Sequence, residues 1–267
     1  MWQVAFSPDG RLLAVATDPN GPRDIFNPDR EGEARLWDVA TRRPVGRPMI
    51  PGRHSVVALA FSPDGRLLAT GSQEQRAELW DVSTQESVGR PMDVPDDAVA
   101  AVAFSPDGAR LATGGVFGVI RLWDVETQDQ AAPPLAGQLG PVVGVAYDPT
   151  GRFLATTTFF GETRLWDPAT GLAYGGDLVS AEILDSMLHE PDLRAAILPV
   201  RSAFSPDGSH LAVAGLASRA MLWDLSLDTW RTRACDLVGR NLTAQEWNVY
   251  LPAGTEYRAT CPEWPEG

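Results

Sequence analysis

Residues 56–82, VVALAFSPDGRLLATGSQEQRAELWDV, decide the fold of this 267-residue chain. Two apolar runs flank Ser62-Pro63-Asp64-Gly65, which places Ser, Pro and Gly where a type I turn favours them, so the runs are expected to form a hairpin. A third apolar run closes with Leu79-Trp80-Asp81, and a fourth can follow the polar residues after it. The segment therefore predicts four short strands, at residues 56–61, 67–70, 77–82 and 87–92.

The same unit recurs along the chain. Phe-Ser-Pro-Asp-Gly begins at Phe6, Phe61, Phe104 and Phe204, and the relaxed copy Tyr-Asp-Pro-Thr-Gly begins at Tyr147. Each copy is followed by Leu-Trp-Asp, whose last two residues are Trp37-Asp38, Trp80-Asp81, Trp123-Asp124, Trp166-Asp167 and Trp223-Asp224. The tryptophans are 43, 43, 43 and 57 residues apart, and the first copy carries a 12-residue insertion. A fixed period of this length indicates a repeat architecture.

The expected strands are apolar on both faces, so both faces of each sheet must be covered. Face-to-face stacking of successive four-stranded sheets provides this cover, and that arrangement is a β-propeller. The sequence therefore predicts an all-β propeller of five recognisable blades over residues 1–228, with insertions near residues 17–33 and 179–199.

The repeats resemble the WD-repeat β-propeller family in their length, their Ser-Pro-Asp-Gly turns and their closing Leu-Trp-Asp, over residues 1–228. The resemblance implies that the turns between second and third strands lie on one face, together with the connections between blades. The other two turns of each blade would lie on the opposite face. We treat the Trp-Asp pairs as structural repeat positions.

The chain departs from the family in its usual polar core, which includes a His in a Gly-His pair and an Asp six residues before each tryptophan. The residues six before the tryptophans are Glu31, Glu74, Phe117, Phe160 and Ala217. The Gly-His position survives only as Gly52-Arg53-His54 and Gly137-Gln138. We therefore expect the blades to rely more on apolar packing, because a partly satisfied buried polar network is costly.

Residues 229–267 form a different segment, a C-terminal tail. Thr243 and Glu246 have capping-box spacing, which predicts a short helix. The tail resembles that of actinobacterial WD-repeat signalling proteins, many of which join the propeller to an N-terminal NTPase or protease domain. The resemblance implies a bacterial protein, and such an effector domain, absent from this chain, as a partner. Closure of five blades and derivation from a longer protein are both open, and we favour the second.

Composition excludes several classes of protein. The formal net charge of −13 opposes phosphate backbones and anionic lipid, so neither nucleic-acid nor membrane binding is expected. All 22 basic residues are arginine, which excludes enzymes that depend on a catalytic or P-loop lysine. The N-terminus has no signal-peptide pattern, so we expect a cytoplasmic protein. Two alternatives are open for Cys235 and Cys261: reduced thiols, or one bridge that fixes the tail.

No catalytic, cofactor-binding or metal site is predicted. The three histidines fall at unrelated repeat positions, and neither a nucleophile elbow nor a zinc-binding motif is present. The aspartates of the Pro-Asp-Gly turns serve turn geometry. We therefore expect a non-catalytic scaffold or sensor that binds a protein or peptide partner. The alternative is a propeller-type hydrolase or lactonase with an active site in the central channel.

Insertions that gather on one face of a repeat protein often mark its binding face. By the family geometry, both insertions of this chain project from the face of the second-to-third turns, where residues 180–188 could add a small amphipathic helix. The candidate partner-binding residues on this face are Arg53, His54, Phe117, Phe159 and Phe160. For Phe117 and Phe160 an alternative is open, in which the rings fold inward and fill the space of the missing Asp.

Overall fold

The structure is a computed structural model that describes residues 3–17, 32–52, 55–95, 97–174, 201–214 and 220–226, with the single residues 229, 241 and 261. The predicted 18–31 part of the first insertion, residues 180–188 and the tail helix lie outside the described residues. In the part described, regular structure is almost entirely β, as the sequence predicts.

The described residues contain seventeen strands in five antiparallel sheets, which are numbered 1 to 5 in chain order. Sheets 1 and 2 have four strands: β1 (Val4–Phe6), β2 (Leu12–Thr17), β3 (Glu33–Asp38), β4 (Arg43–Met49), then β5 (Val56–Phe61), β6 (Leu67–Ser72), β7 (Arg76–Asp81), β8 (Ser87–Asp93). Sheets 3 to 5 have three: β9 (Val99–Phe104), β10 (Arg110–Gly115), β11 (Ile120–Asp124); β12 (Val142–Tyr147), β13 (Leu154–Thr158), β14 (Thr163–Trp166); β15 (Arg201–Phe204), β16 (His210–Ala214), β17 (Ala220–Asp224).

The four-stranded prediction is therefore wrong for sheet 3, whereas in sheet 4 the predicted fourth strand falls mostly outside the described residues. In sheet 3 the fourth strand is reduced to two isolated bridges, which pair Trp123 with Gln130 and Ile120 with Leu135. The segment between these bridges contains Pro133-Pro134, and proline has no N–H to donate to a β ladder. Sheet 4 keeps one such bridge, between Trp166 and Ala173.

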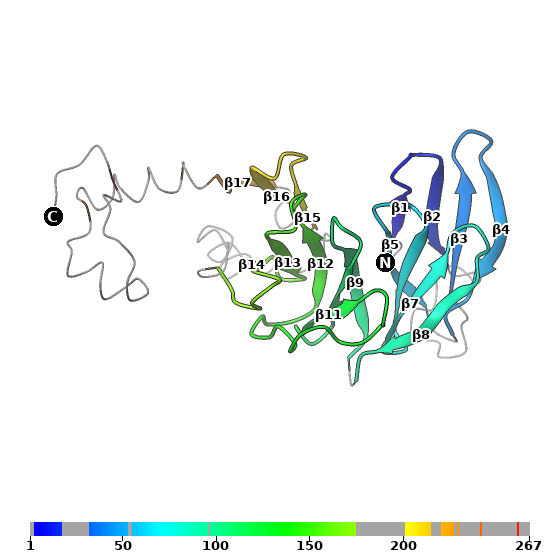
Figure 1. The fold of residues 1–267 in the computed structure, drawn as a ribbon, viewed down its shortest axis with the longest axis horizontal. Helices are drawn as coiled ribbons and strands as arrows, with labels where there is room; N and C mark the ends of the chain where they lie inside the picture. The colour runs from blue at the N-terminus through cyan, green and yellow to red at the C-terminus, as the bar shows by residue number, and fades with distance from the viewer. Residues whose placement is uncertain are drawn as a thin grey trace, which may run out of the picture.

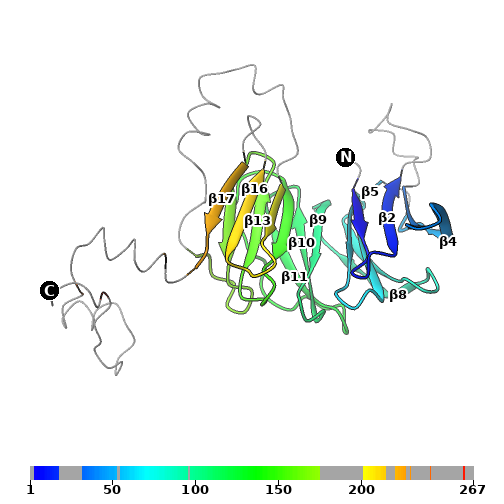
Figure 2. The same ribbon diagram turned by 90° about the horizontal axis from the view of Figure 1, so that it is seen from above.

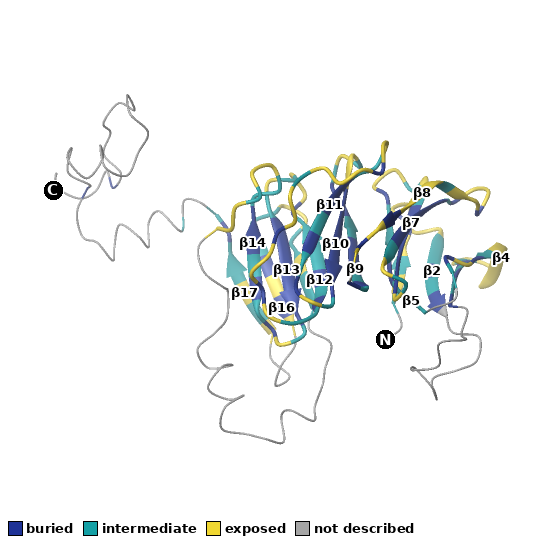
Figure 3. Cartoon of the chain, turned by 90° about the horizontal axis from the view of Figure 1, so that it is seen from below, coloured by how far each residue is buried: buried dark blue, intermediate teal, exposed yellow. Residues whose placement is uncertain are grey.

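The sheets stack face to face in a row, with sheets 1 and 5 at its opposite ends (Figures 1 and 2). The first strands of neighbouring sheets contact each other along the row, as β5 does β9 and β9 does β12. Exposed residues gather on the turns and on the outer strands β4 and β8, while the inner strands are largely buried (Figure 3).

One type of interface joins the sheets. We call the two faces of a sheet the Trp face, which bears the tryptophan of Trp-Asp, and the Leu face, which bears the leucine before it. The Trp face of sheet 2 packs on the Leu face of sheet 1, where it joins Leu68 and Trp80 to Ala14, Ala34 and Leu36. The same contact is repeated between sheets 2 and 3, 3 and 4, and 4 and 5. This arrangement explains why the strands are apolar on both faces.

The Ser-Pro-Asp-Gly turns form a second regular contact between sheets. Gly65 has a φ of +72°, a conformation that favours glycine, and the position of its missing Cβ lies 3.5 Å from Pro8 Cδ of the preceding turn. Equivalent pairs follow along the row: Pro63 with Gly108, Pro106 with Gly151, and Pro149 with Gly208. The turns therefore stack in register across all five sheets.

A buried glutamine ties sheet 3 to sheet 2. The Gln128 side chain donates from Nε2 to the Val88 carbonyl at 2.7 Å and accepts from the Arg90 N–H at 2.5 Å. Gly89 lies between these residues with a φ of +70°, and a Cβ there would collide with the Gln128 amide. The Val-Gly-Arg-Pro-Met sequence of β8 is identical to residues 45–49 of β4, where Gly46 faces Gln85 in the same way.

One buried polar contact is repeated in sheets 2 to 4. The indole Nε1–H of Trp80, Trp123 and Trp166 donates to the hydroxyl of the threonine ten residues earlier, at 3.0, 3.0 and 2.8 Å. In sheet 5 this position is Val213, and Trp223 Nε1 is buried without a hydrogen-bond partner among the described residues. The blades therefore rely on apolar packing less completely than the sequence suggests.

Cys261 is disulfide-bonded, which contradicts the alternative of two reduced thiols. Its backbone N–H also donates to Asn241 Oδ1 at 2.6 Å. Disulfides are rare in cytosolic proteins, so the disulfide at Cys261 does not support the expectation that the protein is cytoplasmic.

The tryptophan–threonine contact predicts opposite effects of two substitutions. Thr113→Val leaves the buried Trp123 N–H without its acceptor and is expected to lower the free energy of unfolding by about 1–3 kcal/mol. Val213→Thr offers Trp223 an acceptor and is expected to raise it by about 1 kcal/mol. Urea denaturation followed by tryptophan fluorescence measures both, and shifts of the same sign would contradict the prediction.

Candidate functional site

The predicted binding face, here called the connection face, carries the turns between second and third strands and the connections between sheets. Phe117 lies in the turn between β10 and β11, and Phe159 and Phe160 lie in the turn between β13 and β14. Arg53 and His54 lie outside the described residues, as does most of each insertion. The structure therefore places three of the five predicted residues.

Phe117 and Phe160 point outward, so neither fills the space of the missing Asp. Their exposed fractions are 72% and 51%, and Leu139 in the connection between sheets 3 and 4 is 79% exposed. Phe159 is half-buried and meets Phe160 edge to face, with ring centroids 5.7 Å apart. Leu139 is not among the residues predicted from the sequence, although an apolar side chain within the polar segment Gly137-Gln138-Leu139-Gly140 is a signal that could have indicated it.

Contacts between glycines and their neighbours bring these side chains together. At Gly118, next to Phe117, the position of the missing Cβ lies 2.3 Å from the Gln138 carbonyl oxygen. At Gly140, next to Leu139, the equivalent position lies 2.5 Å from the Phe160 ring. The connection therefore packs between the two turns, and three exposed apolar side chains lie on these neighbouring segments. We call Phe117, Leu139 and Phe160 the apolar cluster.

A hydrogen bond between Gln138 and Thr156 anchors the connection between sheets 3 and 4 to strand β13. The Gln138 side chain is buried, and the Thr156 hydroxyl donates to Gln138 Oε1 at 2.5 Å while accepting from Trp166 Nε1. Glu162 Oε2 accepts the Leu139 N–H at 3.3 Å. The Thr156 hydroxyl thus links Gln138 to the Trp166 indole. The Gln138 side chain points inward, whereas the next side chain, Leu139, is exposed to solvent.

Asp97 fixes the turn that displays Phe117. Its Oδ1 accepts the Phe117 N–H at 3.1 Å, and its side chain lies against Gly115, where a Cβ would collide with Oδ2. The residue is buried, and burial raises the pKa of the Asp97 carboxyl, although hydrogen bonds from the backbone oppose this. Among the described residues Oδ2 has no hydrogen-bond partner.

A charged group lies at the connection-face end of sheet 2. Arg76 forms ion pairs with Glu74, at 3.4 Å between Nη2 and Oε2, and with Glu78, at 3.8 Å between Nη1 and Oε1. The Glu74 carboxylate also lies against Gly52. Glu78 stands two residues before the tryptophan, where sheets 1, 3 and 4 have arginine. Burial raises the pKa of Glu78 to about 7, since the attraction of Arg76 is smaller and Glu74 and Asp93 repel the charge.

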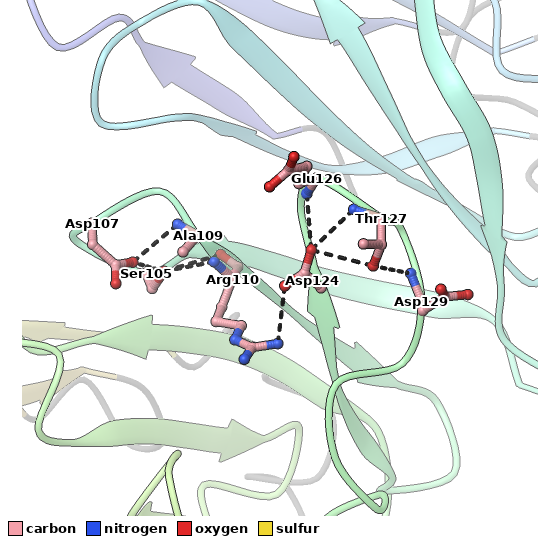
Figure 4. Close-up of polar contacts among 8 residues, drawn as sticks. All are labelled: Ser105, Asp107, Ala109, Arg110, Asp124, Glu126, Thr127 and Asp129. Atoms are coloured by element: carbon pink, nitrogen blue, oxygen red, sulfur yellow. Dashed lines mark hydrogen bonds and ion pairs between the residues drawn. The ribbon is translucent and has the colours of Figure 1, made fainter.

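The opposite face carries the aspartates of the turns, and they are engaged in those turns. In sheet 3, Asp107 accepts from the Ser105 hydroxyl and the Ala109 N–H, and Asp124 accepts from Thr127 (Figure 4). Arg110 joins the two turns by contacting Asp124 at 3.4 Å. These hydrogen bonds hold the pKa of both carboxyls below the usual range. Within the described residues no three His, Cys, Asp or Glu side chains could hold a metal ion.

A hollow of about 440 Å³ opens on this opposite face between sheets 3 and 4. Tyr147 lines it, and its hydroxyl is buried without a hydrogen-bond partner in the described structure. Burial raises the pKa of Tyr147, so the hydroxyl stays neutral. The other four repeats have phenylalanine here, which marks Tyr147 as a local variation of a packing residue.

Comparison with known proteins identifies the repeats. The family model described as WD domain, G-beta repeat matches residues 49–81 and 90–124, which include β5 to β7 and β9 to β11. No curated protein matches the chain. In the described part of the chain, no helix has the length and apolar character needed to cross a membrane.

The buried Glu78 predicts a pH-dependent stability. Its pKa is about 7 in the folded state against 4.5 for an ordinary glutamate, so between these values the folded state binds more protons than the unfolded state. The free energy of unfolding should therefore fall as pH rises from 4.5 to 7. Glu78→Gln should remove this fall and stabilise the protein at pH 8 by about 1–2 kcal/mol. Urea denaturation at several pH values measures it, and parallel curves for both proteins would contradict it.

The two matched segments are WD repeats, and the stacked antiparallel sheets around them are consistent with a WD propeller. Proteins with such repeats generally mediate protein–protein interactions and are generally non-catalytic.

Proposed function

We propose that this chain is a non-catalytic interaction module that binds a protein or peptide segment through the apolar cluster of the connection face. The observation that carries the proposal is the exposure of Phe117, Leu139 and Phe160 on three segments that pack against one another. Large apolar side chains gathered on a surface mark interaction sites, and aromatic residues are enriched among those that dominate binding energy.

The backbone beneath the cluster supports the proposal. The Phe117 N–H is held by Asp97, the Leu139 N–H by Glu162, and the connection by the buried Gln138. A surface that is already ordered loses less conformational entropy when a partner binds. The contacts of the cluster therefore contribute to affinity with little cost of ordering.

Charge indicates the character of the partner. The chain has a net charge of −13, and attraction between opposite charges speeds association and excludes partners of like charge. We therefore propose a segment with apolar side chains for the cluster and basic residues around them.

The proposal extends to parts of the chain outside the described residues. Arg53 and His54 would enlarge the binding surface, together with the insertions near 17–33 and 179–199. Residues 1–228 would form a propeller of five repeats and residues 229–267 a tail with a short helix. The module would serve a larger bacterial signalling protein with an NTPase or protease effector domain.

Selection from a random peptide library displayed on phage tests the binding site. Peptides selected on the wild-type chain are expected to bind at least tenfold more weakly to Leu139→Ser and to Phe117→Ser, because each substitution removes an exposed apolar contact. A tenfold change in Kd corresponds to about 1.4 kcal/mol of binding free energy. Fluorescence anisotropy with the selected peptides measures the affinities.

Leu172→Ser is the matched control, since Leu172 is a similarly exposed leucine in a turn of the opposite face. It should leave peptide affinity unchanged. Stability should change by no more than about 0.5 kcal/mol in all three variants, because the side chains are exposed. Equal affinity of every peptide for wild type and cluster variants would overturn the proposal.

A further inference from the structure

The two ends of the row expose opposite faces of the repeated interface. Sheet 1 presents its Trp face and sheet 5 its Leu face, because within the row each Trp face packs on the Leu face before it. The leucine of the Leu face is 3% exposed or less in sheets 1 to 4, whereas Leu222 of sheet 5 is 69% exposed. At the other end Phe6 is 62% exposed, whereas its equivalent in sheet 3, Phe104, is 8% exposed.

The exposed face of sheet 5 matches, residue for residue, a Leu face that is covered within the row. The register of sheet 5 places Ala203 beside Ala212, Ala212 beside Leu222, and Ala214 beside Ala220. The register of sheet 1 places the same residue types together, as Ala5, Ala14, Leu36, Ala16 and Ala34. The Trp face of sheet 2 covers this set in sheet 1.

The exposed face of sheet 1 matches the Trp face of sheet 2 at four positions. Sheet 2 contributes six residues to its contact with sheet 1, and four of them have counterparts of the same type in sheet 1, namely Phe61, Leu68, Trp80 and Val82. Sheet 1 has the same four residue types at the equivalent positions, which are Phe6, Leu13, Trp37 and Val39. These four side chains line an apolar hollow of about 520 Å³.

We propose that these faces bind each other between two copies of the chain, with sheet 5 of one copy packed on sheet 1 of the next. The contact would repeat, between two copies, most of the part of the interface between sheets 1 and 2 that the first three strands of each sheet form. The stacked Pro-Asp-Gly turns support this contact. In every later turn a proline of the preceding turn lies within 4 Å of the position of the missing glycine Cβ, whereas Gly10 of the first turn has no atom within this distance. In the assembly, Pro206 of one copy would lie against Gly10 of the next copy, as Pro8 lies against Gly65 within the chain. The contact is head to tail, because it joins two different faces.

Two variants with one blocked face each test the proposal. Phe6→Arg blocks the face of sheet 1, and Leu222→Arg blocks the face of sheet 5. Both side chains are exposed, so a charge there should leave each chain folded, which circular dichroism checks. Sedimentation equilibrium of the full chain should show a mass that rises with concentration above the 28.8 kDa of the monomer. Each variant alone should remain a monomer.

The mixture of the two variants is the decisive sample. Phe6→Arg keeps an intact sheet 5 and Leu222→Arg keeps an intact sheet 1, so an equimolar mixture should form a dimer with one copy of each and no larger species. Leu172→Arg, with a leucine as exposed as Leu222 but on a turn, should associate like the wild type. Val39→Arg provides a second block of sheet 1.

Three results would overturn the proposal. A wild-type chain that is monomeric at every concentration would show that the chain covers its own end faces. Dimers formed by one variant alone would show that like faces pair. A monomeric mixture of the two variants would show that association uses another surface.

Discussion

The packing of a Trp face on a Leu face is the contact on which the rest of the structure depends. Each sheet is too thin to bury its own side chains, so Leu68 and Trp80 are covered only by the sheet before them, and Leu79 only by the sheet after. Burial of apolar surface is the main favourable term in folding. The sheets therefore gain their stability from their neighbours, and the row, not the single sheet, is the folded unit.

Polar contacts then fix the register of this stack. The Gln128 side chain forms hydrogen bonds with the backbone of the preceding sheet on both sides of Gly89. The glycines of the Pro-Asp-Gly turns lie against the prolines of the preceding turns. Such contacts have a defined direction, whereas apolar packing does not. Regular stacking brings the turns of successive sheets side by side. The apolar cluster is a product of that regularity, since its side chains come from two sheets and the connection between them.

The sequence predicted the first three strands of a repeat and the turns, because those depend on spacing and on local turn chemistry, but its fourth strand is missing from the described sheet 3. It also predicted which face carries Phe117 and Phe160. It could not decide whether the two rings point inward, since their orientation depends on contacts with residues distant in sequence, such as the hydrogen bond from the Phe117 N–H to Asp97. It did not identify Leu139, because exposure of a residue in an irregular connection depends on how that connection packs against its neighbours.

The sequence by itself determined an all-β chain of repeated units, because a period of 43 residues and paired apolar runs require stacked sheets. The tertiary structure alone decided which apolar residues are covered. Leu36 and Leu222 occupy the same position in their repeats, yet one is buried and the other exposed. Among the described residues, sheet 2 covers this face of sheet 1, and no sheet covers the same face of sheet 5. Burial depends on neighbours in space, and a repeat pattern specifies the same residue at every place in the row without specifying where the row ends.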